Sequence, residues 1–188
     1  MTITSGLISP KIDYPPNIIN KNKKIMGMLG VYMLADEATI ERLSNDNNLF
    51  EAVEEYGEES TTIAYDIDKL WDGLHFLLTG ISAEEPIEDN PLSEAIVGTK
   101  DFDCEDFIAY TMPNHIKEIV DALNKVNIEA LIENMDLSKF RKAKIYPNIW
   151  VKKDEEQLKA ELKKEFLNLK AFYEKALNSQ TGVLVSIY

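Results

Sequence analysis

The feature that most constrains the fold is the C-terminal end of the chain, where an amphipathic helix leads into a strand that is apolar on both faces. From Leu158 to Leu177 the apolar residues recur at helical spacing, with charged residues on the opposite side. The sequence GVLVSIY follows, at residues 182 to 188, and is rich in β-branched residues. Such a strand has to be covered on both sides, so we predict that it lies inside a sheet.

A second apolar run, MGMLGVYML at residues 26 to 34, has the length and the content of a buried strand. It ends at Asp36, a predicted N-cap for a helix from Glu37 to Ser44. Because both apolar strands need cover on two faces, we expect the first and the last strand of the domain to lie together at the centre of the sheet.

Further elements follow from local signals. Asp66 or Asp68 can cap a helix that contains Trp71 and that ends at Gly80, and Asp154 with Gln157 resembles a capping box. We also expect a short helix around residues 49 to 53, strands at 61 to 67 and 107 to 112, a turn and short strand at 91 to 98, and helices at 113 to 123, 128 to 135 and 137 to 143.

This order of elements predicts a single α+β domain, in which a small mixed sheet is packed by several helices including the long C-terminal one. No strand is followed by a Gly-rich phosphate-binding turn, so a doubly wound nucleotide-binding fold is disfavoured. Residues 1 to 25 differ from the rest, because they contain four lysines, one aspartate and three prolines. We therefore expect an extended basic arm at 1 to 25 and the folded domain at 26 to 188.

The charge of the chain limits its partners. It contains 33 Asp and Glu against 20 Lys and Arg, a net charge of -13, and residues 26 to 188 alone carry -16. Nucleic acid is not expected as a partner, because its binding depends on basic side chains that displace counterions. The acidity favours a basic protein partner, and the alternative is that it serves only solubility.

Location and cofactors follow from what the sequence lacks. Cys104 is the only cysteine, so no internal disulfide forms, and we expect a reducing, cytoplasmic setting. No segment has the roughly 20 apolar residues of a membrane span, and the first ten residues do not resemble a signal peptide. The common metalloprotease, redox, hydrolase and nucleotide-binding motifs are missing from the sequence, so we predict no cofactor and no catalytic activity.

Five segments in one order carry a family resemblance: MGMLGVYMLAD (26 to 36), DIDKLWDGLHFLLTG (66 to 80), PLSEAIVG (91 to 98), YPNIW (146 to 150) and LKAFYEKA (169 to 176). In these the chain resembles the YfbM-like family of small bacterial proteins, over nearly all of residues 26 to 188. The resemblance implies a single α+β domain without an established catalytic activity. Bacterial families of this kind include immunity proteins encoded beside toxins, and that role is carried over as an expectation.

The chain departs from the family pattern in two places. The 25-residue arm precedes the position where such proteins usually begin. Val151 stands where the family tends to place an acidic residue after the tryptophan, which weakens any site built on that carboxylate.

His75 is the main candidate for chemistry. Asp72 lies three residues earlier on the same predicted helix and could orient the ring as a general base. The alternative is that His75 packs in the core and donates one hydrogen bond, and we favour it because no nucleophile motif accompanies the histidine. Gly73 supports packing, since a glycine inside a helix suggests that another backbone approaches there. Trp150 is interpreted as either a core residue or an interface anchor.

The segment from Glu84 to Asp106 is the most acidic part of the chain, and within it DFDCED suggests a calcium loop. The EF-hand pattern fails, because Asp106 and Met112 occupy the positions that require Gly and Glu. The carboxylates around Cys104 are expected to raise the pKa of its thiol, which disfavours a catalytic thiolate.

We therefore predict a non-enzymatic cytoplasmic binding protein, an immunity protein that occludes the basic active-site cleft of a cognate toxin. The expected partner-binding residues are Glu84, Glu85, Glu88, Asp89, Asp101, Asp103, Glu105 and Asp106. The alternative is a small-molecule-binding domain or enzyme with a pocket formed by Asp72, His75, Tyr146 and Trp150. No metal site, no nucleic acid and no membrane is expected.

Overall fold

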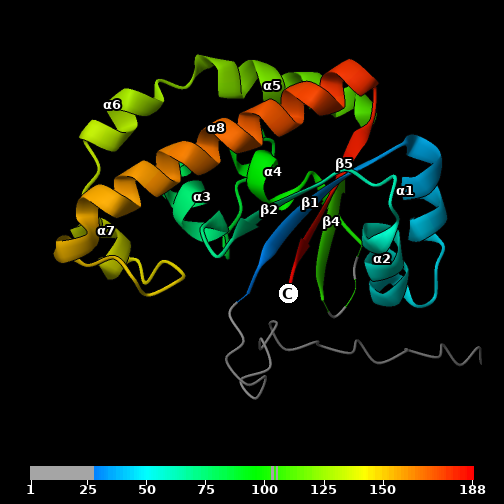
Figure 1. The fold of residues 1–188 in the computed structure, drawn as a ribbon, viewed down its shortest axis with the longest axis horizontal. Helices are drawn as coiled ribbons and strands as arrows, with labels where there is room; N and C mark the ends of the chain where they lie inside the picture. Colours follow the sequence, from blue (N-terminus) through cyan, green and yellow to red (C-terminus); the bar gives the residue numbers. More distant parts are fainter. Residues whose placement is uncertain (1–27, 103, 105) are drawn as a thin grey trace, which may run out of the picture.

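The computed structural model describes residues 28 to 102, 104 and 106 to 188. Its five strands form one sheet in the order β2-β1-β5-β4-β3, so the first and last strands lie side by side near the centre, as predicted (Figure 1). The strands are β1 (Gly30–Ala35), β2 (Ala64–Asp68), β3 (Lys100–Asp101), β4 (Phe107–Thr111) and β5 (Gly182–Ile187). The predicted basic arm lies outside the described residues, as do Asp103 and Glu105.

The sheet differs from the prediction in one respect, because all four strand pairings are antiparallel and not mixed. Strand direction is set by how the connections return to the sheet, which local sequence patterns do not encode. The central pair runs in register from Gly30 opposite Ile187 to Ala35 opposite Gly182.

Helices cover both faces of the sheet (Figure 1). On one face lie α1 (Glu37–Ser44) and α2 (Leu49–Glu58). On the other face lie α3 (Trp71–Thr79), α4 (Pro91–Val97), α5 (Ile116–Lys125), α6 (Ile128–Glu133), α7 (Leu137–Lys142) and α8 (Glu155–Ser179), with short 3-10 turns η1 (Pro113–His115) and η2 (Lys152–Asp154).

The alternation of β5 explains why both faces need cover. Leu184 points to the α1–α2 side, whereas Val183 and Val185 join the larger core under α3 to α8. Every residue of β5 is buried, as its apolar sequence requires. In the described part of the chain no helix is both long enough and apolar enough to cross a membrane.

Two predicted helix ends, the start of α1 and the end of α3, are confirmed by the structure. Asp36 accepts a hydrogen bond from the Thr39 backbone N at 2.8 Å, so it caps α1 as predicted. Gly80 ends α3 with a φ of 80°, in the left-handed region that favours glycine.

Three other local predictions were wrong. The segment at 91 to 98 forms helix α4, because Asn90 caps it by accepting from the backbone N of Leu92 and Ser93, and proline occupies its first turn. Helix α3 begins after Leu70 without a side-chain cap, since the Asp66 carboxylate accepts from the Asp68 backbone N instead. Asp154 likewise makes no capping bond at the start of α8.

Candidate functional site

The N-terminal half of α3 places the candidate chemical residues inside the protein. Asp72 and His75 are 2% and 0% exposed, respectively, and the glycine between them lies against the indole of Trp150. The close approach at Gly73 is therefore made by a side-chain ring and not by a backbone, which corrects the expectation from sequence.

Asp72 joins two segments of the chain that are far apart in sequence. Its Oδ1 accepts from Ser82 Oγ at 2.9 Å and from the Ala83 backbone N at 2.7 Å. Its Oδ2 accepts from the Tyr146 backbone N at 2.7 Å. Both carboxylate oxygens of Asp72 are therefore used to hold the α3–α4 connection to the α7–α8 connection. His75 is oriented by other groups.

His75 is bonded at both ring nitrogens. Its Nδ1 lies 2.8 Å from the Ile81 carbonyl oxygen, which can only accept, so Nδ1 carries the proton. Its Nε2 lies 2.8 Å from Ser93 Oγ and accepts from that hydroxyl. Ser93 Oγ in turn accepts from the Ile87 backbone N at 3.0 Å.

Ser93 is the residue that the sequence analysis missed. A Ser–His contact of 2.8 Å is the spacing of a nucleophile and its general base, but Ser93 and His75 are both 0% exposed. A substrate has no access to either side chain in this state, and the third partner is a carbonyl in place of a carboxylate. The pair therefore holds the α3–α4 connection against α3, as the packing interpretation of His75 predicted. The Asn90–Pro91 helix-start signal was the available indication that Ser93 would point inward.

This environment makes stability depend on pH. Burial lowers the pKa of His75 below its usual value, because the charged ring would lose its hydration. The unfolded chain takes up the proton near pH 6.5 while the folded chain resists it, so the stabilisation is present above about pH 6.5 and is lost as pH falls below it.

We expect the free energy of unfolding to fall between pH 7 and pH 5 by at most about 1.4 kcal/mol per pH unit from this group. Urea denaturation of the wild type and of His75→Asn, whose amide can still donate to Ile81, measures the difference. The exposed His115→Asn is the control. The assignment fails if His75→Asn retains the pH dependence of the wild type.

Tyr146 and Trp150 are also structural. The Tyr146 ring stacks on Trp71, with centroids 5.5 Å apart, and burial raises the pKa of its phenol. Trp150 is 1% exposed, and its Nε1 donates to the Ile145 carbonyl oxygen at 2.8 Å. Trp150 is thus a core residue and not an interface anchor. Together with Asp72 and His75 these residues form a buried junction between α3, the α3–α4 connection and the α7–α8 connection.

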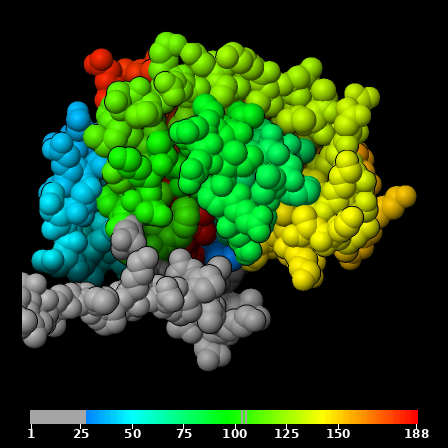
Figure 2. Space-filling view, turned by 180° about the vertical axis from the view of Figure 1, so that it is seen from behind, coloured from blue at the N-terminus to red at the C-terminus, as the bar shows by residue number. Residues whose placement is uncertain are grey.

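The acidic residues occupy two places. Glu84, Glu85, Glu88 and Asp89 are exposed on the α3–α4 connection, and Asp101 is exposed on β3 beside the half-buried Asp106. Figure 2 shows that the segment coloured from teal to green, which contains both groups, covers the middle of one face.

The pKa of the Cys104 thiol is raised, as predicted from sequence. Desolvation raises this pKa more than the carboxylates of Asp106 and Asp101 do, so the main cause differs from the predicted one.

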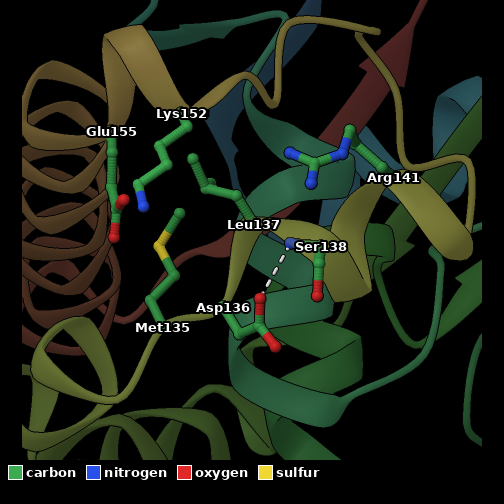
Figure 3. Close-up of a pocket in the computed structure, with 7 residues that line it drawn as sticks. All are labelled: Met135, Asp136, Leu137, Ser138, Arg141, Lys152 and Glu155. Carbon is green, nitrogen blue, oxygen red and sulfur yellow. Dashed lines mark hydrogen bonds between the residues drawn. The ribbon is translucent and has the colours of Figure 1, made fainter.

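Two surface hollows lie away from the buried junction. One, of about 310 Å³, is lined by residues of α7 and of the start of α8: Met135, Asp136, Leu137, Ser138, Arg141, Lys152 and Glu155 (Figure 3). The other, of about 420 Å³, lies between the α1–α2 connection and the β3–β4 turn. Among the residues that the structure describes, no three His, Cys, Asp or Glu side chains are placed to hold a metal ion.

Comparisons with known proteins identify relatives that this chain matches over nearly their whole length. Residues 26 to 186 match the family model "Domain of unknown function (DUF1877)". Protein YfbM of Escherichia coli (strain K12) is 28% identical over 167 residues, which cover 86% of this chain and 99% of that protein. The crystal structure of YfbM from Escherichia coli, described as a protein of unknown function, matches with a TM-score of 0.72 at 26% identity, over 85% of this chain and 99% of that one.

Proposed function

The chain belongs to the DUF1877 family, and from the arrangement of its own residues we propose that it is an acidic cytoplasmic binding protein. Its partner is a basic protein, and the role that fits best is that of an immunity protein that occludes the basic active-site cleft of a toxin.

The observation that carries the proposal is the construction of the acidic loop, which we define as residues 84 to 89. Four of its six residues are exposed carboxylates, Glu84, Glu85, Glu88 and Asp89. The loop is anchored from inside at Ala83, which donates to Asp72, and at Ile87, which donates to Ser93. Buried hydrogen bonds therefore hold a dense negative charge in a defined position on the surface.

Such an arrangement suits recognition of a basic cleft. Carboxylates on a pre-organised loop can occupy the places of substrate phosphates, and the entropic cost of ordering the loop has already been met in folding. The charge also accelerates encounter with a partner of opposite sign. A role for the buried junction in chemistry has no comparable support, because Asp72, His75 and Trp150 are hydrogen-bonded within the core and the Tyr146 ring stacks on Trp71.

The test compares two variants with the same change in charge. In the loop variant Glu84→Gln, Glu85→Gln, Glu88→Gln and Asp89→Asn are combined, and asparagine tolerates the positive φ of 54° at that position. The matched control carries four Glu→Gln changes on α1 and α2, at Glu41, Glu54, Glu55 and Glu58, which are all exposed.

Binding is measured to the purified product of a neighbouring gene that inhibits growth. We expect the loop variant to associate at least about 10-fold more slowly and to protect cells less, whereas the control variant binds like the wild type. Added salt should slow association of the wild type and of the control variant more than that of the loop variant. Equal binding by the two variants would contradict the proposal. So would neutralisation of the growth-inhibiting protein that does not change when salt is added.

A further inference from the structure

A second charged surface lies on the same protein and has the opposite sign. From Leu137 to Lys153 the chain contains six basic residues and no acidic one, although the rest of residues 26 to 188 carries a net charge of -22. These six residues define the basic patch: Lys139, Arg141, Lys142, Lys144, Lys152 and Lys153. All six are exposed, and Ile149 and Val151 between them are 39% and 38% exposed.

Among the residues that the structure describes, the basic patch forms no ion pair. The ion pairs of the described residues use lysines of α5 and α8, and none of them uses a residue of the patch. Arg141 donates to the Trp150 carbonyl oxygen at 2.8 Å, which positions the guanidinium without cancelling its charge. Of the nearby carboxylates, Glu155 pairs with Lys159, whereas Asp136 offsets part of the patch charge: the bond from Ser138, together with Lys139 and Arg141, lowers the pKa of its carboxyl.

Arg141 and Lys152 of the patch line a hollow of about 310 Å³ that also contains Leu137. Figure 3 shows Leu137 at its centre, with Arg141 and Lys152 on either side of it. Met135 and Leu137 are buried, and Asp136 and Glu155 also line the hollow. Arg141 and Lys152 on either side of Leu137 suit an acidic peptide segment that carries an aliphatic side chain.

The acidic loop has this chemistry, since its sequence is EEPIED with Ile87 half-buried among the exposed carboxylates. The loop and the patch belong to neighbouring segments, because Asp72 accepts from both Ala83 and Tyr146. In Figure 2 the teal-green segment that contains the loop borders the yellow segment that contains the patch, on one face.

We propose that this face binds a second copy of the chain, with the acidic loop of each copy against the basic patch of the other. A surface that carries adjacent patches of opposite sign is self-complementary across a two-fold axis, so one dimer makes the contact twice. Nucleic acid fits less well, because the patch presents no exposed aromatic ring for stacking on bases: Trp150 is buried and Tyr146 stacks on Trp71. The inference does not depend on the proposed function, since self-association is measured without any other protein.

Sedimentation velocity of the full chain tests the proposal. We expect the sedimentation coefficient to rise with protein concentration at low salt and to return to the monomer value at about 0.5 M NaCl, where charges are screened beyond about 4 Å. A wild type that stays monomeric at low salt up to a few hundred micromolar would overturn the proposal.

Charge reversal then identifies the surfaces. The patch-reversal variant combines Lys142→Glu, Lys152→Glu and Lys153→Glu. The loop-reversal variant combines Glu84→Lys, Glu85→Lys and Glu88→Lys. Each variant alone should lose dimerisation at low salt, because like charges then face each other. A one-to-one mixture of the two should dimerise again, since each altered surface meets a complementary one.

The rescue by mixing separates this contact from other causes. Loss of folding in either variant would prevent rescue, and circular dichroism monitors that directly. A control with Glu54→Lys, Glu55→Lys and Glu58→Lys on α2 should dimerise like the wild type. Two folded variants that remain monomeric as a mixture, or a wild-type dimer that neither variant weakens, would refute the contact.

Discussion

Replacement of Asp72 by Ala is expected to lower the free energy of unfolding by about 3 to 5 kcal/mol, because buried polar groups would lose their acceptor. The change leaves the backbone N of Ala83 and Tyr146 and the hydroxyl of Ser82 without the oxygens that lie 2.7 to 2.9 Å away. Ala83 is buried and Ser82 and Tyr146 are half-buried, so water compensates only in part.

Urea denaturation measures this effect, with Asp72→Asn as an informative second variant. Asparagine keeps the shape and one acceptor oxygen, but its amide N would face an N–H or hydroxyl donor. It should therefore lie between Ala and the wild type in stability. The control is Asp121→Ala on the exposed face of α5, which loses only its surface ion pair with Lys117 and should change stability little. An Asp72→Ala variant as stable as the wild type would refute the connecting role of this carboxylate.

Replacement of Gly73 by Ala should destabilise the protein by about 2 to 4 kcal/mol through overpacking. A Cβ at this position would lie 2.6 Å from Cζ2 of Trp150 and closer still to Cη2. The indole does not move away easily, because its Nε1 is bonded to Ile145 and its ring packs on Phe140 with centroids 4.6 Å apart. This cost exceeds the gain of about 1 kcal/mol that alanine brings to a helix interior.

A double-mutant cycle with Trp150→Phe identifies the cause. The smaller ring vacates the space that the new methyl group needs, so Gly73→Ala should cost at least about 1 kcal/mol less in the Trp150→Phe background. Gly57→Ala in α2 is the control, because its Cβ would meet only the flexible Met33 sulfur, at 3.2 Å. Additive effects of the two substitutions would show that the indole is not the obstacle.

Prediction from sequence succeeded where one local pattern dictates one environment. The burial of β5 on both faces, the stripe of α8 and the αL stop at Gly80 each depend on the residues of a single segment. The cap of α1 by Asp36 also needs only neighbours within one turn. The prediction of a turn and a short strand at 91 to 98 was wrong, although the Asn90–Pro91 signal for a helix start is local too.

The site was predicted less completely. Spacing along α3 suggested that Asp72 orients His75, but each of these side chains bonds to groups from other parts of the chain. The sequence placed the acidic residues at the surface without indicating that Ser93 and Asp72 anchor the loop that carries them. Nor did it suggest that the basic residues of α7 and η2 would lie beside that loop.

The sequence by itself therefore determined the charge of the domain, the identity of most helices and strands, and the need for a central strand pair covered on both faces. Only the tertiary structure decided the antiparallel direction of the strands, the partners of Asp72, His75 and Ser93, and the placing of acidic and basic surfaces on one face. The physical reason is range: hydrophobic periodicity and capping act within a few residues, whereas the partner of a buried polar atom is fixed by which distant segments pack together.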